Sequence, residues 1–100
     1  MPGAREVEST LLTWCALVAQ GAVATANDSR EANLCRVASV LLRSRFPAEA
    51  ARLLQSSGAY FEQHPEEQRL APVDLVRQRW LVSLPRFRDQ LVRVLHHQEF

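Results

Sequence analysis

Residues 10–19, TLLTWCALVA, place apolar side chains at the three- and four-residue steps of an α-helix. These side chains fall on two neighbouring stripes, one made of Leu11, Cys15 and Val18 and the other of Leu12, Ala16 and Ala19. Two stripes form a wide apolar face, which is typical of a helix that is covered on more than one side. The segment therefore predicts a first helix, beginning near Arg5, around which the rest of the chain packs.

The helical period continues along the chain, and its interruptions predict where further helices begin and end. Asp28 stands three residues before a glutamate, which is a capping-box spacing and predicts a second helix that runs to about Phe46. Pro47 ends this helix, because the residue before a proline is kept out of the α-helical conformation, and it suits the first turn of a third helix. We expect the third helix to continue through Gly58 to His64.

Residues 64–72, HPEEQRLAP, form the clearest break in the helical pattern. Two prolines bracket a polar stretch, which predicts a loop between the third and fourth helices. The apolar period then resumes and predicts a fourth helix from Pro72 to Leu84, ended by Pro85. A fifth helix is expected to follow this proline as far as His97.

The pattern as a whole predicts one all-α domain over residues 1–100, a compact bundle of four to five helices with a frayed start at residues 1–4. No period-two alternation competes with it, so no strand is expected. A chain of this length buries enough surface for one core. We expect that core to contain the apolar residues on the inner helix faces: Leu11, Trp14, Cys15, Val18, Leu34, Val37, Leu41, Leu54, Phe61, Val76, Trp80, Leu84, Leu91 and Leu95.

The composition is that of an ordinary globular protein, with 47% hydrophobic and 23% charged residues and a formal net charge of +1. A net charge this small gives no general attraction to nucleic acid or membrane, and no apolar stretch is long enough to span a bilayer. All 12 basic residues are arginine, whose planar guanidinium group suits carboxylate partners. The two cysteines, Cys15 and Cys35, provide no disulfide framework, which predicts a cytoplasmic or nuclear protein.

No pattern in the chain is typical of catalysis or of metal binding. His64 lies in the acidic break, and His96 and His97 lie at the C-terminal end, where the chain is poorly suited to hold catalytic geometry. The CxxC, HxxxH and HExxH spacings of metal sites are absent, and the glycines are too scattered to form a phosphate-binding loop. We therefore expect a protein that is not an enzyme and that uses no cofactor or metal ion.

Arginines recur at seven-residue steps on two of the predicted helices. Arg36 and Arg43 share a face of the second helix, and Arg86 and Arg93, with His97 beyond them, share a face of the fifth. Such faces fit a cationic groove for an acidic peptide or, less well at this net charge, for nucleic acid. They fit equally the solvated side of an amphipathic helix, and the sequence leaves these alternatives open.

Thr10, Leu11, Cys15 and Ala19 follow the pattern small residue, leucine, three spacers, cysteine, three spacers, small aliphatic residue. This ten-residue pattern resembles the BC box, the helical motif by which receptor subunits of ubiquitin ligases dock elongin. The resemblance implies a docking helix with Leu11 and Cys15 exposed in the free domain. The alternative is that the same residues pack in the core, and the breadth of the apolar face favours this alternative.

Together these patterns predict a non-enzymatic protein–protein interaction or scaffolding module. We expect it to bind a partner helix or acidic peptide through an apolar groove with an arginine rim, as a monomer or a homodimer. An elongin-binding subunit of a ubiquitin ligase and a weak nucleic-acid-binding helical domain are the alternatives. The candidate binding residues are Leu11, Cys15, Ala19, Arg36, Arg43, Arg86 and Arg93.

Overall fold

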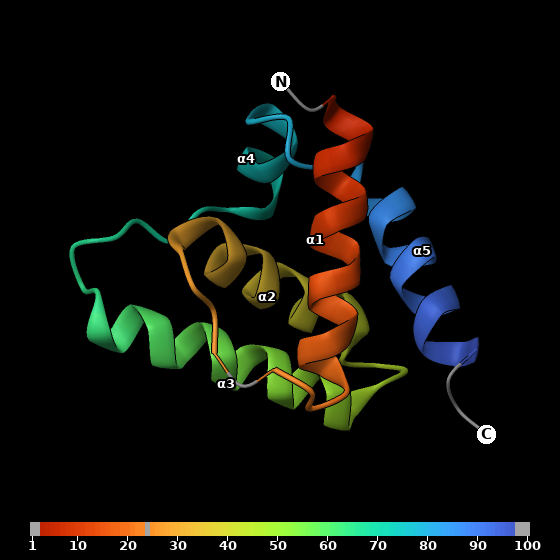
Figure 1. The fold of residues 1–100 in the computed structure, drawn as a ribbon, viewed down its shortest axis with the longest axis horizontal. Coiled ribbons are helices and arrows are strands. Elements are labelled where there is room, and N and C mark those ends of the chain that lie inside the picture. The colour runs from red at the N-terminus through yellow and green to blue at the C-terminus, as the bar shows by residue number, and fades with distance from the viewer. Residues whose placement is uncertain (1–2, 24, 98–100) are drawn as a thin grey trace.

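Helix α1 (Ala4–Ala19) lies at the centre of the computed structural model, which describes residues 3–23 and 25–97 (Figure 1). The described residues form five helices and no strand in one compact body, which confirms the all-α prediction. α1 crosses the pair formed by α2 and α3, and α5 packs along its other side. Residues 1 and 2 of the predicted frayed start lie outside the described residues, and α1 begins one residue earlier than expected, at Ala4.

α1 ends in a turn that requires glycine. The backbone N–H of Gly21 donates to the carbonyl of Val18 at 3.0 Å, and that of Ala22 donates to the carbonyl of Leu17 at 2.9 Å. These paired bonds form a Schellman motif, in which the residue after the cap is left-handed. Gly21 has a φ of 81°, which glycine adopts without steric cost. The turn directs the chain away from α1 and towards the start of α2.

The start of α2 (Ser29–Leu42) confirms the predicted cap. The Oδ1 atom of Asp28 accepts a hydrogen bond from the backbone N–H of Glu31 at 2.8 Å, and the Oε1 atom of Glu31 accepts one from the backbone N–H of Asn27 at 2.9 Å. α2 ends before its predicted end at Phe46, because the chain needs a short turn in which to reverse before the next helix begins.

α3 (Pro47–Gln63) runs back along α2, so the two helices form an antiparallel hairpin (Figure 1). Phe46 is buried at the start of α3, and Pro47 occupies its first turn as predicted. The prediction that α3 continues through Gly58 is also confirmed. Gly58 is exposed, and a Cβ atom added there would meet nothing within 4 Å, so the helix passes this position without a close neighbour.

The segment predicted as one helix over 72–84 is divided into two elements, so this prediction is wrong. α4 (Pro72–Arg77) is short, and Arg79 follows it in the left-handed conformation with a φ of 62°. A left-handed residue ends a helix because the chain leaves the helical direction there. α5 (Leu84–His97) begins where the predicted helix was expected to end. Pro85 lies in the first turn of α5, where a missing N–H costs no helical hydrogen bond.

The core lies where α1, α2, α3 and α5 meet, and half of the predicted core residues are buried in it, whereas Phe61 is buried in a separate small cluster. Leu54 is not: its side chain is 54% exposed, whereas Leu53 is fully buried. Consecutive helical residues point about 100° apart, so only one of the two faces the core. Other predicted core residues are half-buried at its edge: Trp14, Leu41, Val76, Trp80 and Leu84. The fully buried side chains that sequence reasoning missed include Leu42, Leu75 and Phe87.

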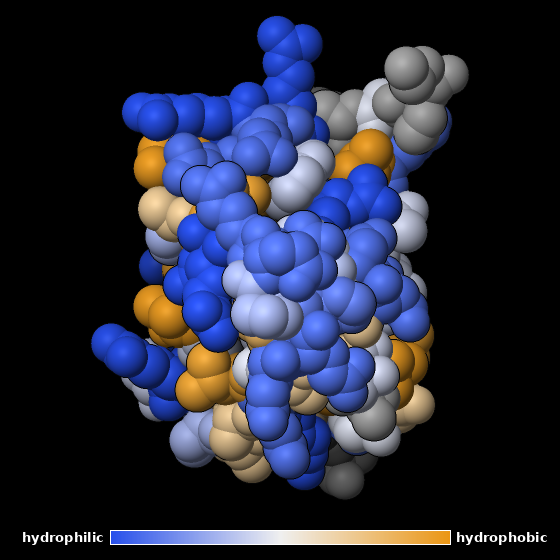
Figure 2. Space-filling view, turned by 90° about the vertical axis from the view of Figure 1, so that its left-hand side faces the viewer, coloured by the Kyte–Doolittle hydropathy of each residue, from blue (hydrophilic) through white to orange (hydrophobic). Residues whose placement is uncertain are grey.

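A polar clamp, made of Asn33 and Arg36 on α2, holds the loop that precedes α4. The fully buried Asn33 side chain donates from Nδ2 to the carbonyl of Gln68 at 3.1 Å and accepts at Oδ1 from the N–H of Leu70 at 2.7 Å. Arg36 donates to the carbonyl of Leu70. The predicted polar loop is therefore attached to the bundle through its backbone. Figure 2 shows that this end of the molecule is mainly hydrophilic.

A buried carboxylate on α1 contacts the segment in which α5 begins. Glu8 on α1 is only 4% exposed, and its Oε2 atom accepts a hydrogen bond from the backbone N–H of Val82 at 2.9 Å. Its Oε1 atom lies 4.0 Å from Nε of Arg86, at the start of α5.

None of the helices within residues 3–23 and 25–97 combines the length and the apolarity that crossing a bilayer requires.

Candidate functional site

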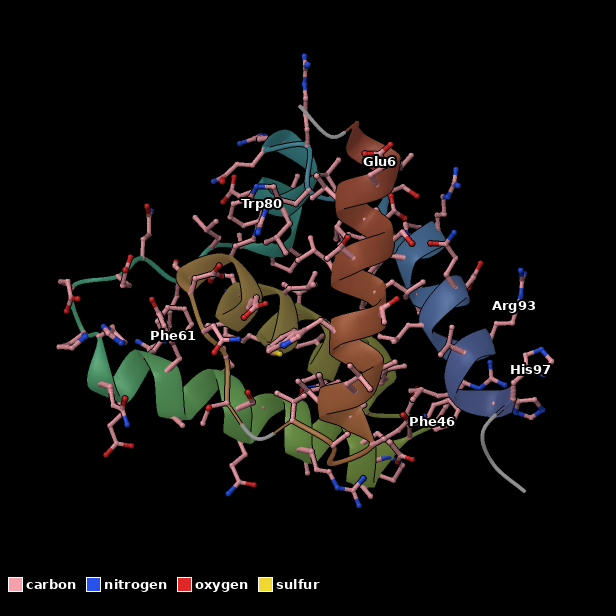
Figure 3. All side chains as sticks on the ribbon, viewed as in Figure 1. Glu6, Phe46, Phe61, Trp80, Arg93 and His97 are labelled. Carbon is pink, nitrogen blue, oxygen red and sulfur yellow. The ribbon has the colours of Figure 1, made fainter. Side chains whose placement is uncertain are left out.

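Six residues line a hollow of about 290 Å³ between the turn that joins α2 to α3 and the C-terminal half of α5. We call this hollow the basic groove, and its lining residues are Arg45, Asp89, Val92, Arg93, His96 and His97. Figure 3 shows Arg93 and His97 projecting outward from α5. The groove therefore combines side chains from two segments that are far apart in the sequence.

The apolar face of α5 determines which of its side chains reach the groove. Phe87, Leu91 and Leu95, at four-residue steps, are buried in the core. The face turned away from them carries the groove residues of α5, with the half-buried Val92 at the boundary. Phe46, beside Arg45, is buried in the same core cluster as Leu91. This shared packing places the α2–α3 turn next to the end of α5.

Two arginines of the basic groove have no partner within the part of the chain that the structure describes. Arg45 and Arg93 are exposed, and neither takes part in a hydrogen bond or ion pair there. Asp89 is the acidic residue of the lining, and its Oδ1 atom lies 3.2 Å from Nη2 of Arg88. The nearby carboxylate is thus already in contact with a guanidinium outside the lining, and the groove keeps an excess of positive charge.

The other arginines predicted as binding residues do not join Arg93. Arg36 donates to a backbone carbonyl in the polar clamp, so its guanidinium is already engaged within the fold. Arg43 is exposed and does not line the groove. Arg86 lies near the buried Glu8 and lines a separate, smaller hollow. Seven-residue spacing places Arg86 and Arg93 on one face of α5, but the groove covers only the C-terminal part of that face.

Arg45 was missed by sequence reasoning, although a signal for it exists in the chain. It precedes Phe46 and Pro47, and a residue before such a pair is well placed to stand in a turn. The predicted second helix, which runs to about Phe46, includes Arg45 as one more polar residue on a solvated face. The neighbourhood of Arg45 and α5 depends on packing between distant segments, which helical periodicity does not report.

Three of the four residues of the docking motif belong to the core, and the fourth, Thr10, is exposed. Leu11 is 3% exposed, and Cys15 and Ala19 are completely buried. The docking interpretation requires Leu11 and Cys15 to be exposed, and in this fold they are not. Burial raises the pKa of the Cys15 thiol well above its usual range, and the adjacent Cys35 thiol and the charge of Glu31 add to the shift. Both thiols are free and buried.

A second hollow, of about 340 Å³, lies between the end of α1 and the outer side of α3. Val18, Val23 and Ala59 give it an apolar character, and Arg52 stands at its edge. Nη1 of Arg52 donates to the carbonyl of Ala19 at 2.8 Å, where it satisfies the end of α1. This guanidinium is therefore already used within the fold, unlike those of Arg45 and Arg93.

Within residues 3–23 and 25–97, no group of three or more His, Cys, Asp or Glu side chains is arranged to hold a metal ion. Comparisons with protein-family models, with curated proteins and with solved structures found no match to this chain.

Proposed function

We propose that this chain is a non-enzymatic protein-interaction domain that binds an acidic segment of a partner protein in the basic groove. One observation carries the proposal: Arg45 and Arg93, from different elements, line the same hollow and have no partner within the described residues. Guanidinium groups form planar, paired hydrogen bonds with carboxylates, so two of them in one groove can bind successive acidic side chains. Val92 offers an apolar surface between them and the core.

The exposure of both arginines determines what kind of binding is expected. Ion pairs at an exposed site are worth about 0.2–1 kcal/mol each and are screened by salt. We therefore expect a weak affinity that falls as the ionic strength rises. Such a groove would select and orient a partner whose main contacts lie elsewhere on the domain, since charge complementarity contributes more to specificity and association rate than to affinity.

The proposal is tested by calorimetric titration of the protein with an oligo-aspartate peptide and, in parallel, with an oligo-asparagine peptide of the same length. We expect only the acidic peptide to bind. Arg45→Glu and Arg93→Glu should each weaken its binding roughly fivefold or more, because each replaces an attraction by a repulsion. Arg43→Glu is the matched control, since it makes the same charge change at an exposed site outside the groove.

Two outcomes would contradict the proposal. If Arg43→Glu weakens binding as much as Arg93→Glu, the peptide responds to the overall charge and not to the groove. If a single-stranded oligonucleotide of equal length binds more tightly than the peptide at the same ionic strength, the groove is a nucleic-acid site. The formal net charge of +1 favours the protein partner, because non-specific nucleic-acid binding depends on a large excess of positive charge.

We also propose that the protein works in a reducing compartment, the cytoplasm or the nucleus. The support is that both cysteines are buried as free thiols in the core. Stable disulfides are the rule in oxidising compartments and are rare in reducing ones. Localisation of the tagged protein by fluorescence microscopy tests this, and secretion into the medium would contradict it.

A further inference from the structure

We propose that protons regulate the basic groove, so that acidic segments bind more tightly at mildly acidic pH. The inference rests on the proposed function and concerns the same groove. Its basis is that His96 and His97 both line the hollow that contains Arg45 and Arg93. Histidine is the side chain that ordinarily gains its positive charge between about pH 8 and pH 5. Two histidines beside two permanently charged arginines make the charge of the groove variable.

The placement of both histidines follows from the end of α5. Neighbouring residues on a helix point about 100° apart, so a long groove along one face would receive only one of them. Here the hollow lies at the last turn of α5, and both side chains line it. Both are exposed, so water is available to the charged and uncharged forms alike. The C-terminal turn of a helix also favours positive charge, through the orientation of its carbonyl groups.

Among the described residues, the charged groups that line the hollow with the two histidines come from two elements. From the α2–α3 turn comes the positive Arg45. From α5 itself come the positive Arg93 and the negative Asp89, which is in contact with Arg88. The carboxylates of a bound acidic segment favour the protonated form of the histidines.

The direction of the effect follows from linkage. An acidic ligand that favours the protonated histidines is itself bound more tightly when they are protonated, so binding takes up protons and the affinity increases as the pH falls. Aspartate side chains remain ionised at pH 5.5, since their usual pKa is about 3.9. Two exposed ion pairs added to the groove correspond to roughly a three- to tenfold higher affinity at pH 5.5 than at pH 7.5.

The experiment is calorimetric titration with the oligo-aspartate peptide at pH 7.5 and pH 5.5, at constant ionic strength, in buffers of different ionisation heat. The buffers reveal how many protons are taken up on binding. We expect the wild-type protein to bind roughly three- to tenfold more tightly at the lower pH, with proton uptake. His96→Gln/His97→Gln should lose this gain, so that its own affinity is nearly the same at pH 7.5 and pH 5.5 and binding takes up few protons.

His64→Gln is the matched control, because His64 is the remaining histidine of the chain. It lies at the C-terminal end of α3, where its Nδ1 atom is 3.6 Å from Oε1 of Glu66. His64→Gln should keep the full pH dependence. A wild-type affinity that does not change with pH would overturn the inference, as would an unchanged pH dependence in His96→Gln/His97→Gln. In either case peptide binding itself would still support the proposed function. Failure to bind at both pH values would instead remove both proposals.

Discussion

At the scale of single residues, burial decides what a side chain can do. Cys15 occupies the position at which the docking motif has its cysteine, yet it is completely buried and points into the core. A buried thiol keeps its proton, because the thiolate would lose its hydration. Since the thiolate is the reactive form, Cys15 is expected to behave as a small apolar side chain. The motif is present in the sequence, but burial makes its cysteine inaccessible to a partner and keeps the thiol unreactive.

The raised pKa of Cys15 predicts how stability depends on alkaline pH. The folded state holds the proton above the ordinary thiol pKa of 9.0, so the unfolded chain loses it first as the pH rises. The contribution of Cys15 to stability is therefore complete below that value and decreases above it. In urea titrations at pH 8 and pH 10, the wild type should lose more unfolding free energy between the two than Cys15→Ala. Equal losses would contradict this account of the thiol.

At the scale of elements, glycine and proline act through the backbone conformation that each position requires. Pro47 and Pro85 both lie in the first turn of a helix, although only Pro47 was predicted to do so. Pro85 follows an apolar run that resembles a helix, and the period alone could not show that Arg79 interrupts it. The two glycines Gly21 and Gly58, in contrast, adopt different backbone conformations. Gly21 is left-handed in a turn, whereas Gly58 is an ordinary residue of α3.

The two glycines predict opposite effects of the same substitution. Gly58→Ala should stabilise the protein by about 0.5–1 kcal/mol, because alanine restricts the unfolded chain and meets no neighbour in α3. Gly21→Ala should destabilise it by about 1–2 kcal/mol, because a side chain opposes the positive φ. Urea unfolding of both variants checks the pair. A destabilising Gly58→Ala would show that α3 is not an undistorted helix at that position.

At the scale of the whole molecule, contacts between distant segments hold in place the loop whose position helical periodicity cannot predict. The polar clamp of Asn33 and Arg36 joins α2 to a loop more than thirty residues later in the chain. A fully buried amide requires such partners, because an unpaired polar group in the core costs about 1–3 kcal/mol. The spacing of Arg36 predicts a binding residue, whereas in the structure its guanidinium holds the predicted loop.

The clamp predicts how the loop responds to loss of Asn33. In Asn33→Ala the N–H of Leu70 and the carbonyl of Gln68 lose their buried partner, so the loop should open more often. Trypsin cleaves after arginine, and the bond between Arg69 and Leu70 should be cut several-fold faster in the variant than in the wild type. Val40→Ala, an exposed change on the same helix, is the control. Equal cleavage rates in all three proteins would show that the clamp does not protect the loop.

The sequence by itself determined the helical class, the cap at Asp28, the continuity of α3 and part of the core, because these depend on periodicity and on backbone preferences that act over a few residues. It could not determine which arginines line one hollow. Arg45 lines the same hollow as Arg93 because Phe46, Leu91 and Leu95 pack in one core, and such proximity has no local signature. Likewise, only the tertiary structure decided that TLLTWCALVA turns Leu11, Cys15 and Ala19 inward, since residues that can dock a partner can equally well pack against their own domain.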